Sequence, residues 1–406
     1  MVEEFHEPFE DPAANFVSTK LLGGGIVPWT LEPVCMHGTV VATICVYTST
    51  TYANGRGLSV VAVPAEERLI IQATVIRQMT FNNADLAKTE NDDFMDSRFS
   101  VEHIHGKGQG LVARHTLNRG DSVYRKSPVT LLQQTPMMKM HRPSRYLLMQ
   151  IAVERLPKKT RDLFMAMKGH FGGDEYSDRI NTNSFAAKIG KAGDMYWSVY
   201  PESARVNHDC RPNVAYYIDP NTLVHHMHAL RAIHPGEEVT TSYLLPYHPW
   251  HERRQRTQFQ WGFNCTCSLC TAPPPLIAAS DARLALIKNL ENELANTTPN
   301  RTANPDTALE LISLYKQERL DGAIAEAYQM ATFEYAFITN RAMTMKYAAL
   351  SVEALLLWLG PHSIATKSFI ELWKEPTNHV SWNYTKVAKE RGVFGPPENF
   401  KVESQG

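Results

Sequence analysis

Residues 207–213 read Asn-His-Asp-Cys-Arg-Pro-Asn, residues 236–243 read Gly-Glu-Glu-Val-Thr-Thr-Ser-Tyr, and residues 263–270 read Phe-Asn-Cys-Thr-Cys-Ser-Leu-Cys. Strand-like apolar runs separate these three polar segments within the span 200–270. An ordinary buried core does not gather so many side chains with polar or metal-binding chemistry. We therefore expect the functional site in this span.

Composition narrows the class of protein. The chain has 406 residues, a length that favours two or three domains. Apolar residues make up 43% and charged residues 20%, which favours a packed globular protein over a disordered one. Lys and Arg number 41 against 42 for Asp and Glu, so the net charge of -1 disfavours direct binding to nucleic acid.

The sequence also bears on the compartment. The first thirty residues are acidic and contain no apolar core of signal-peptide length, and the apolar run 354–359 is too short to cross a bilayer. We therefore expect an intracellular protein, in the cytoplasm or nucleus, without a membrane partner. A secretory route stays open, because Cys35 and Cys45 could pair in an oxidising compartment, and glycosylation sequons begin at Asn296, Asn300 and Asn383.

The N-terminal quarter of the chain divides into two parts. Residues 1–30, rich in Pro, Gly and acidic residues, predict a flexible arm. Residues 31–96 predict a small β-rich subdomain with a linker. Within it, β-branched runs on both sides of an Asn-Gly turn indicate a hairpin over 40–63, followed by a short helix over 65–79 and a polar linker over 82–96.

The rest of the chain changes from strand to helix. Residues 97–250 are strand-rich, with a helical insert at about 137–180, and residues 251–272 carry the cysteine-rich segment. Prolines at 273–275 mark a boundary, beyond which 273–406 predicts an all-α domain, plausibly of tetratricopeptide-like helix pairs. The fold class is therefore α+β. The expected C-terminal helices span 282–294, 306–315, 321–340, 342–359 and 364–373.

The cysteine spacing indicates a metal site. Cys265, Cys267 and Cys270 form a C-x-C-x-x-C knuckle, a spacing suited to wrapping thiolates around one ion. A tetrahedral structural zinc needs four ligands, and Cys210 is the nearest unassigned thiol in the sequence. The alternative is a set of buried or disulfide-linked cysteines without metal.

Three further patterns favour structural roles. His225, His226 and His228 lie in an alternating run, which predicts a strand with His226 and His228 on one face; no carboxylate at ligand spacing supports a metal site. The glycine-rich segment 106–110 fits neither a phosphate loop nor a dinucleotide fingerprint, so a turn between strands is expected. The basic run 251–256 is interpreted as a solvated helix face.

Taken together, the order and spacing of the polar segments resemble those of SET-domain protein lysine methyltransferases. The resemblance is closest to the SET-and-MYND branch and to fungal-type SET proteins without the MYND zinc module, and it covers residues 99–270. It implies a β-rich SET domain over 97–250, a zinc-bound post-SET knuckle over 251–272, and S-adenosylmethionine and Zn²⁺ as cofactors. It also implies a monomer acting on a lysine-bearing protein, of the histone or the non-histone kind.

The resemblance also implies roles for individual residues. A cysteine of the Asn-His-Asp-Cys motif closes the zinc site in that family, so the ligands would be Cys210, Cys265, Cys267 and Cys270. The implied cofactor-binding residues are Lys107, Gly108, Gln109, Asn183, Asn207, His208 and Phe263. The implied walls of the lysine channel are Phe185, Tyr200 and Trp261. Trp261 departs from the family pattern, which leaves the channel width and the degree of methylation open.

Tyr243 is the expected catalytic residue. In-line methyl transfer from a sulfonium to an amine requires a neutral lysine, whose free pKa is about 10.4, and an apolar aromatic channel disfavours the ammonium form. A tyrosine hydroxyl can orient the amine without competing as a nucleophile. The alternatives are a catalytically silent SET-fold scaffold and a methyltransferase of small molecules or other side chains; the joint presence of Asn207, His208 and Tyr243 argues against the scaffold.

Overall fold

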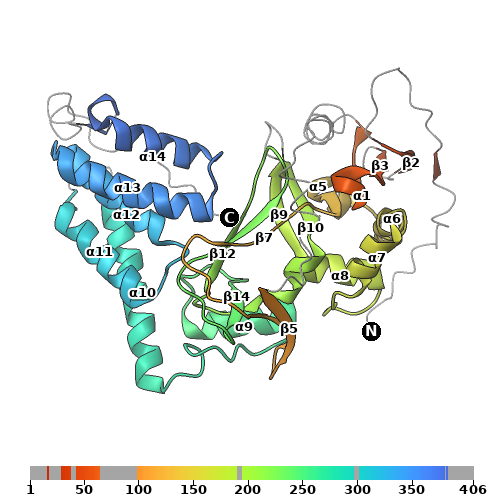
Figure 1. Cartoon of the computed structure of the whole chain (residues 1–406), viewed down its shortest axis with the longest axis horizontal. Coiled ribbons are helices and arrows are strands. Elements are labelled where there is room, and N and C mark those ends of the chain that lie inside the picture. Colours follow the sequence, from red (N-terminus) through yellow and green to blue (C-terminus); the bar gives the residue numbers. More distant parts are fainter. Residues whose placement is uncertain are drawn as a thin grey trace, which may run out of the picture. The chain divides into compact units, whose positions relative to one another are not determined.

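The computed structural model describes residues 16–17, 29–37, 43–64, 98–189, 194–296, 301–379 and 381–382. The chain forms two compact units (Figure 1). The first comprises Met1–Phe94, Arg125–Ala204 and Pro220–His225, and the second comprises Met95–Tyr124, Arg205–Asp219 and His226–Gly406. Most of the expected arm over 1–30, and the whole of the expected helix over 65–79 and linker over 82–96, lie outside the described residues. The domain boundaries expected from the sequence stay predictions.

The first unit is organised on a seven-stranded sheet of order β1-β2-β3-β4-β8-β10-β9. Its neighbouring strands are antiparallel except for β4 and β8, which run parallel. The expected hairpin is confirmed as β3 and β4, and a disulfide between Cys35 and Cys45 joins β2 to β3. The strands are β1 Phe16–Val17, β2 Leu31–Met36, β3 Ile44–Ser49, β4 Leu58–Ala62, β8 Thr130–Gln133, β9 Ser184–Ile189 and β10 Asp194–Val199.

The tight turn before β4 explains why an Asn-Gly sequence stands there. The short segment α1, Tyr52–Gly55, has left-handed backbone at Ala53 (φ 48°) and Asn54 (φ 57°). Asn tolerates this region better than most residues do. The turn returns the chain from β3 into β4, whose five side chains are all buried.

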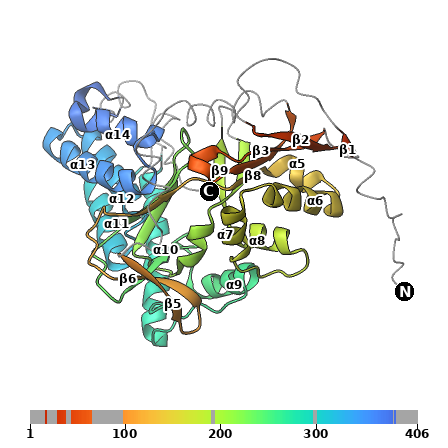
Figure 2. The ribbon, with the colours of Figure 1, turned by 45° about the vertical axis from the view of Figure 1, so that its right-hand side comes forward.

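Among the described residues, four helices share a core with this sheet: α5 Gln134–Lys139, α6 Arg142–Glu154, α7 Lys158–Met165 and α8 Glu175–Asn183. Pro157 separates α6 from α7, because a proline disfavours helical backbone in the residue before it. Figure 2 shows these helices beside the strands of the first unit. Their apolar faces and the sheet share one core, which includes Met36, Val61, Leu132, Leu148, Phe164 and Ile180.

Two smaller sheets lie mostly in the second unit, with orders β11-β14-β6-β5 and β12-β13-β7. The glycine-rich segment forms the expected turn between β5 and β6, where the Lys107 amide donates to the Ile104 carbonyl at 3.0 Å. The strands are β5 Phe99–Ile104, β6 Gly108–Ala113, β7 Ser122–Lys126, β11 Asn207–His208, β12 Val214–Ile218, β13 His225–Ala229 and β14 Glu238–Thr241.

The histidine-rich run forms strand β13, as predicted. His225 and Met227 are buried, whereas His226 and His228 are partly exposed on the same face. The rings of His226 and His228 stack nearly parallel, with centroids 6.2 Å apart. The two histidines on this face of β13 therefore pack ring against ring.

The described part of the second unit contains consecutive helices: α10 Pro274–Leu294, α11 Pro305–Gln317, α12 Ile324–Phe337, α13 Arg341–Trp358 and α14 Ile364–Lys374. All five expected helices are present. Helix α10 begins earlier than expected because prolines are accepted in a first turn, where the missing amide hydrogen has no partner anyway. A capping box at Asn304 starts α11. Among the described helices, none combines the length and apolar character needed to span a membrane.

Candidate active site and zinc centre

The first two polar segments of the sequence lie side by side. Strand β11 runs parallel to β14, with Asn207 opposite Thr240. Asn213 is 1% exposed and strengthens this pairing: its Nδ2 donates to the Glu238 carbonyl at 2.8 Å, and its Oδ1 accepts from the Thr240 amide at 2.8 Å. The donor and the acceptor of the buried amide are thereby both hydrogen-bonded, which fixes the register of the two segments.

Asn207 is held by residues that come from three separate parts of the chain. Its Nδ2 donates to Glu238 Oε1 at 2.9 Å and to the Gln109 carbonyl at 3.2 Å. The other carboxylate oxygen of Glu238 pairs with Lys107 Nζ at 2.6 Å. Because both amide hydrogens of Asn207 are directed by these acceptors, its Oδ1 is oriented as the acceptor for a further donor.

The absence of a side chain at Gly110 lets Asn207 and Glu238 lie close to the backbone of β6. A Cβ added there would lie 2.5 Å from Ile104 Cγ1, 2.8 Å from Asn207 Nδ2 and 3.0 Å from Glu238 Oε1, distances that real Cβ atoms do not adopt without displacement of a neighbour. Glu238 and Gly110 were missed as site residues from the sequence, although both lie in segments singled out there. The available signal was the paired Glu237-Glu238 and the glycine at the end of the turn.

His208 connects the segment that carries Tyr243 to the cysteines. Its Nδ1 accepts from the Tyr243 amide at 3.0 Å, so Nε2 carries the proton and lies 3.3 Å from Cys210 Sγ. Burial lowers the pKa of His208 to about 4, with smaller contributions from nearby charges. The imidazole is therefore neutral at pH 7, and its N–H points at a sulfur.

Tyr243 lies within an aromatic group. Its ring centroid is 5.2 Å from that of Trp261 and 6.4 Å from that of Phe263, the latter at an interplanar angle of 81°. Its hydroxyl donates to the Val206 carbonyl at 2.9 Å. Burial raises the pKa of Tyr243, so the phenol keeps its proton, while the lone pairs of its oxygen can still accept a hydrogen bond.

Helix α9, Trp250–Trp261, leads into the cysteine knuckle. It ends at Gly262, whose left-handed backbone (φ 71°) reverses the chain. The expectation of a solvated face for 251–256 is wrong for Arg253, which is 1% exposed, because the helix packs this side chain toward the cysteines. His251, Gln255 and Arg256 are exposed as expected.

The four cysteines lie together and are not disulfide-bonded. Their sulfur atoms all fall within 4.8 Å of one another, with Cys210 Sγ 3.8 Å from Cys265 Sγ and 3.5 Å from Cys270 Sγ. A zinc tetrahedron with bonds of about 2.3 Å has sulfur–sulfur edges of about 3.8 Å. Hydrogen bonding among the thiols lowers the pKa of Cys267 and Cys270 and raises that of Cys210 and Cys265. The donor set is compatible with zinc, which would bind all four as thiolates.

The remaining predicted residues, Asn183, Phe185 and Tyr200, lie in the first unit. Asn183 Nδ2 donates to two main-chain carbonyls, at 2.8 and 2.9 Å. The rings of Phe185 and Tyr200 are 6.0 Å apart, and His225, missed from the sequence, is 4.8 Å from Phe185 and 4.9 Å from Tyr200. The Tyr200 hydroxyl donates to the Leu223 carbonyl. These residues form one aromatic cluster, and their channel and cofactor roles stay predictions.

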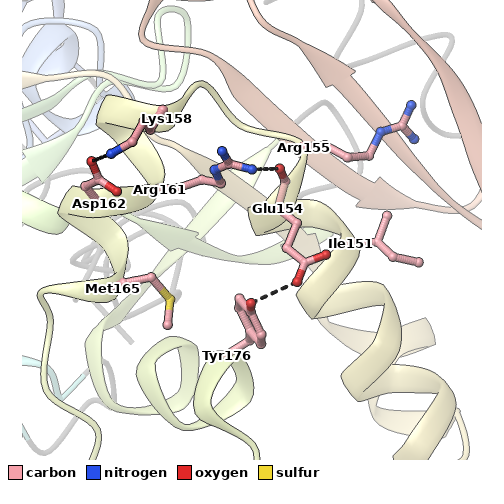
Figure 3. A pocket seen from close by; sticks show the side chains of 8 residues that line it. All are labelled: Ile151, Glu154, Arg155, Lys158, Arg161, Asp162, Met165 and Tyr176. Atoms are coloured by element: carbon pink, nitrogen blue, oxygen red, sulfur yellow. Dashed lines mark hydrogen bonds and ion pairs between the residues drawn. The ribbon is translucent and has the colours of Figure 1, made fainter.

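A surface pocket of about 670 Å³ in the helical part of the first unit holds none of the predicted site residues (Figure 3). Its polar side chains bind one another: Tyr176 donates to Glu154 at 2.9 Å, and Lys158 pairs with Asp162 at 2.7 Å. The pocket is therefore interpreted as a feature of the helix packing.

Comparison with known proteins finds similarity to one family in the span that holds most of this geometry. Residues 108–244 match the SET domain family. N-lysine methyltransferase SMYD2 from Bos taurus is 32% identical over 93 residues, which are 23% of this chain and 21% of that protein. Histone-lysine N-methyltransferase set5 from Schizosaccharomyces pombe is 24% identical over 300 residues, which are 70% of this chain and 85% of that protein.

A solved SET domain of LSMT bound to lysine and AdoHcy is 12% identical and covers 72% of this chain and 85% of that one, at a TM-score of 0.26, too low to support an argument. The match to SMYD2 spans 21% of the length of that protein. Lys107 borders the matched residues, and Gly110, Asn207, His208, Glu238 and Tyr243 lie within them. Residues 108–244 therefore match the SET domain family, and parts of this chain are similar in sequence to the SMYD2 and set5 lysine methyltransferases.

Proposed function

We propose that this protein is an S-adenosylmethionine-dependent protein-lysine N-methyltransferase. The observation that carries the proposal is the grouping of Asn207, His208 and Tyr243 inside the residues that match the SET family. The named activities of the SMYD2 and set5 relatives support the same reaction.

The cofactor side of the site would be built from amides and one aromatic ring. A nucleoside-bearing sulfonium ligand requires directed donors and acceptors more than a charged clamp. Asn207 supplies an amide whose orientation is set by Glu238 and the Gln109 carbonyl. We assign the turn at Lys107, Gly108 and Gln109 to the methionine part of the ligand, and Phe263 to its adenine.

Tyr243 is assigned to the lysine side. S-adenosylmethionine, when bound, supplies a methyl group whose bond to sulfur breaks as the bond to the lysine nitrogen forms in line. The aromatic surroundings of Tyr243 and Trp261 disfavour an ammonium, so the lysine releases its proton to solvent water before the neutral amine attacks. The Tyr243 hydroxyl donates to Val206 and can accept an amine N–H, which directs the nitrogen lone pair toward the methyl carbon.

The zinc ion is assigned a structural role. Four thiolates, from Cys210, Cys265, Cys267 and Cys270, leave no open coordination position for a substrate. Such an ion would tie the knuckle that carries Phe263 to the segment that carries Asn207 and His208. Its binding free energy would thus contribute to the order of the proposed cofactor site.

The test combines binding with turnover. Titration calorimetry should detect S-adenosylmethionine binding, and labelled cofactor should mark lysines of core histones or of a protein peptide array. Both histones and the peptide array are tested because the proposal specifies the substrate only as a lysine-bearing protein. Binding without methylation of any protein would favour the silent scaffold, and absence of both would overturn the proposal. Methylation that survives mutation of every lysine in a labelled peptide would show a different acceptor side chain.

A further inference from the structure

Arg253 carries a charge that the proposed function leaves unexplained. Its side chain is 1% exposed, and it is the largest fully buried side chain of the described residues. Nη1 donates to the His248 carbonyl at 2.7 Å, whereas Nε and Nη2 are buried without a hydrogen-bond partner among the described residues. A buried guanidinium keeps its charge, and removing that charge from water costs several kcal/mol unless an opposite charge lies nearby.

The charges that face Arg253 are those of the cysteine cluster. Trp250, one turn earlier on α9, packs against the four sulfurs, and its Nε1 donates to the Cys270 carbonyl at 2.9 Å, so this end of the helix lies on the cluster. The main attractive partners of the Arg253 charge are the sulfurs of Cys210 and Cys270, followed by Asp281. Asp281 makes no ion pair within 4.0 Å of any described cation, and it accepts from the Trp250 amide at 2.9 Å. The thiolates are therefore the main candidates for the counter-charge.

The neighbouring cation does not compete for this role. Arg211 is also buried beside Cys210, but it is paired with Glu318 at 2.9 Å. Zinc with four thiolates carries a net charge of about -2. Among the buried cations described around this cluster, Arg253 is thus the one that has no carboxylate at ion-pair distance.

We propose that Arg253 is a positioning residue of the zinc centre, supplying the buried positive charge that offsets the negative charge of the four-thiolate zinc site beside Cys210 and Cys270. This inference rests on the zinc site of the proposed function. It also explains why one residue of a basic run is buried. Helix α9, which leads into the knuckle, supplies the positive charge that offsets the negative charge of the zinc site. Partners of this kind, which contact metal ligands, typically change metal affinity by about 10–100-fold.

The experiment measures zinc affinity in the full chain. Protein purified under reducing conditions without chelator is first analysed for zinc. Zinc is then withdrawn by a graded series of a competing chelator from the wild type, Arg253→Gln, Arg253→Lys and the control Arg256→Gln. Arg256 lies on the same helix, but its side chain is 45% exposed. Arg256→Gln therefore deletes the same positive charge at a solvated position.

Arg253→Gln should lower zinc affinity by about 10–100-fold, Arg253→Lys by much less, and Arg256→Gln not measurably. The pH at which half of the zinc is released should rise in Arg253→Gln alone, because protons compete better for thiolates that lack the counter-charge. The thiolate-to-metal absorption band of the cobalt(II)-substituted protein should shift in the same variant. A packing defect alone would move neither of these two readouts in a charge-dependent order.

Three results would overturn the inference: wild-type affinity in Arg253→Gln, equal losses in Arg253→Gln and Arg253→Lys, or an equal loss in Arg256→Gln. If Arg253→Gln does not fold, the charge-retaining Arg253→Lys decides, since it must keep zinc within a few-fold of the wild type. Absence of zinc from the wild type is a separate outcome, because it removes the zinc site itself rather than the role of Arg253 within it.

Discussion

Arg211 and Glu318 form an ion pair of 2.9 Å in which each side chain is only 2% exposed. The same carboxylate accepts from Ser280 at 2.8 Å and pairs with Arg283 at 2.6 Å. Arg211 follows Cys210 in the motif that contains Asn207, whereas Glu318 immediately follows α11. The segment proposed to bind the cofactor is therefore anchored on the C-terminal helices within the second unit.

Glu318→Gln should destabilise this anchor strongly. It leaves the Arg211 charge buried with less compensation, and breaking such a pair costs about 3–5 kcal/mol. Urea denaturation of the purified chain should show this loss in the free energy of unfolding. The matched control is Glu353→Gln, which removes a pair to Arg119 whose acidic side chain is 60% exposed and should cost at most about 1 kcal/mol. Equal effects of the two variants would contradict the assigned role.

Tyr243→Phe should slow methyl transfer while leaving the cofactor bound. The change removes one hydroxyl and little volume, and the rings of Trp261 and Phe263 keep their contacts. Turnover should fall by about 10²–10³-fold, with a nearly unchanged dissociation constant for S-adenosylmethionine. Tyr347→Phe in α13 controls for loss of a buried phenol elsewhere. Wild-type turnover in Tyr243→Phe, with circular dichroism and zinc content intact, would make Tyr243 a structural residue.

Gly110→Ala should weaken cofactor binding, although it replaces no side chain that is proposed to bind the ligand. The new methyl group would meet Asn207 Nδ2 at 2.8 Å and displace the amide from Glu238. We expect S-adenosylmethionine affinity to fall at least about 10-fold, approaching the loss in Asn207→Ala. Gly322→Ala is the control, because its Cβ would make only an ordinary contact of 3.5 Å with Leu230. Titration calorimetry gives both constants; unchanged affinity in Gly110→Ala would separate Asn207 from the cofactor.

Removal of zinc should loosen the knuckle before the rest of the chain. Among the described residues, Trp250, Phe263 and Leu269 supply the partly buried apolar contacts around the four sulfurs, and these are too few to hold the segment without metal. Amide hydrogen exchange should therefore rise first over residues 250–275 when a chelator is added. Uniform exchange changes, or none in protein shown to have lost zinc, would mean that packing alone holds the knuckle.

Glu326→Gln should stabilise the protein progressively as the pH rises. Burial, together with Glu291, raises the pKa of Glu326 to about 7, while the hydroxyls of Tyr247 and Tyr315 donate to its carboxylate. An unfolded glutamate titrates near about 4.3, so between the two values the folded form holds more protons and the free energy of unfolding falls as pH increases. The advantage of the variant should grow from pH 5 to pH 8, by up to about 3 kcal/mol. A difference that is flat with pH would contradict this.

The sequence predicted those parts of the fold and site that depend on local spacing. Three cysteines within six residues indicated one cluster, alternation placed His226 and His228 on one face, and five helices were found where they were expected. The contacts of Gly110 with Asn207 and Glu238 could not be predicted, because they join residues far apart in the chain.

The burial of Arg253 escaped prediction for a related reason. When only the neighbours along the chain are considered, a charged residue within a basic run is predicted to be exposed to solvent. Its environment depends on which face of α9 packs against the cysteines. The pairing of Arg211 with Glu318 likewise requires the C-terminal helices to be in place.

The parallel pairing of β4 with β8 bears on how the protein can be shortened. Residues 58–62 lie beside residues 130–133 in the same sheet, so the N-terminal strands are neighbours of the strand that carries the chain into the helical insert. A fragment beginning at residue 98 would expose the edge of β8 that pairs with β4, with its amide and carbonyl groups unpaired. Exposed edges of this kind recruit strands of other molecules, so such a fragment should aggregate even though it retains every residue assigned to cofactor, zinc and catalysis.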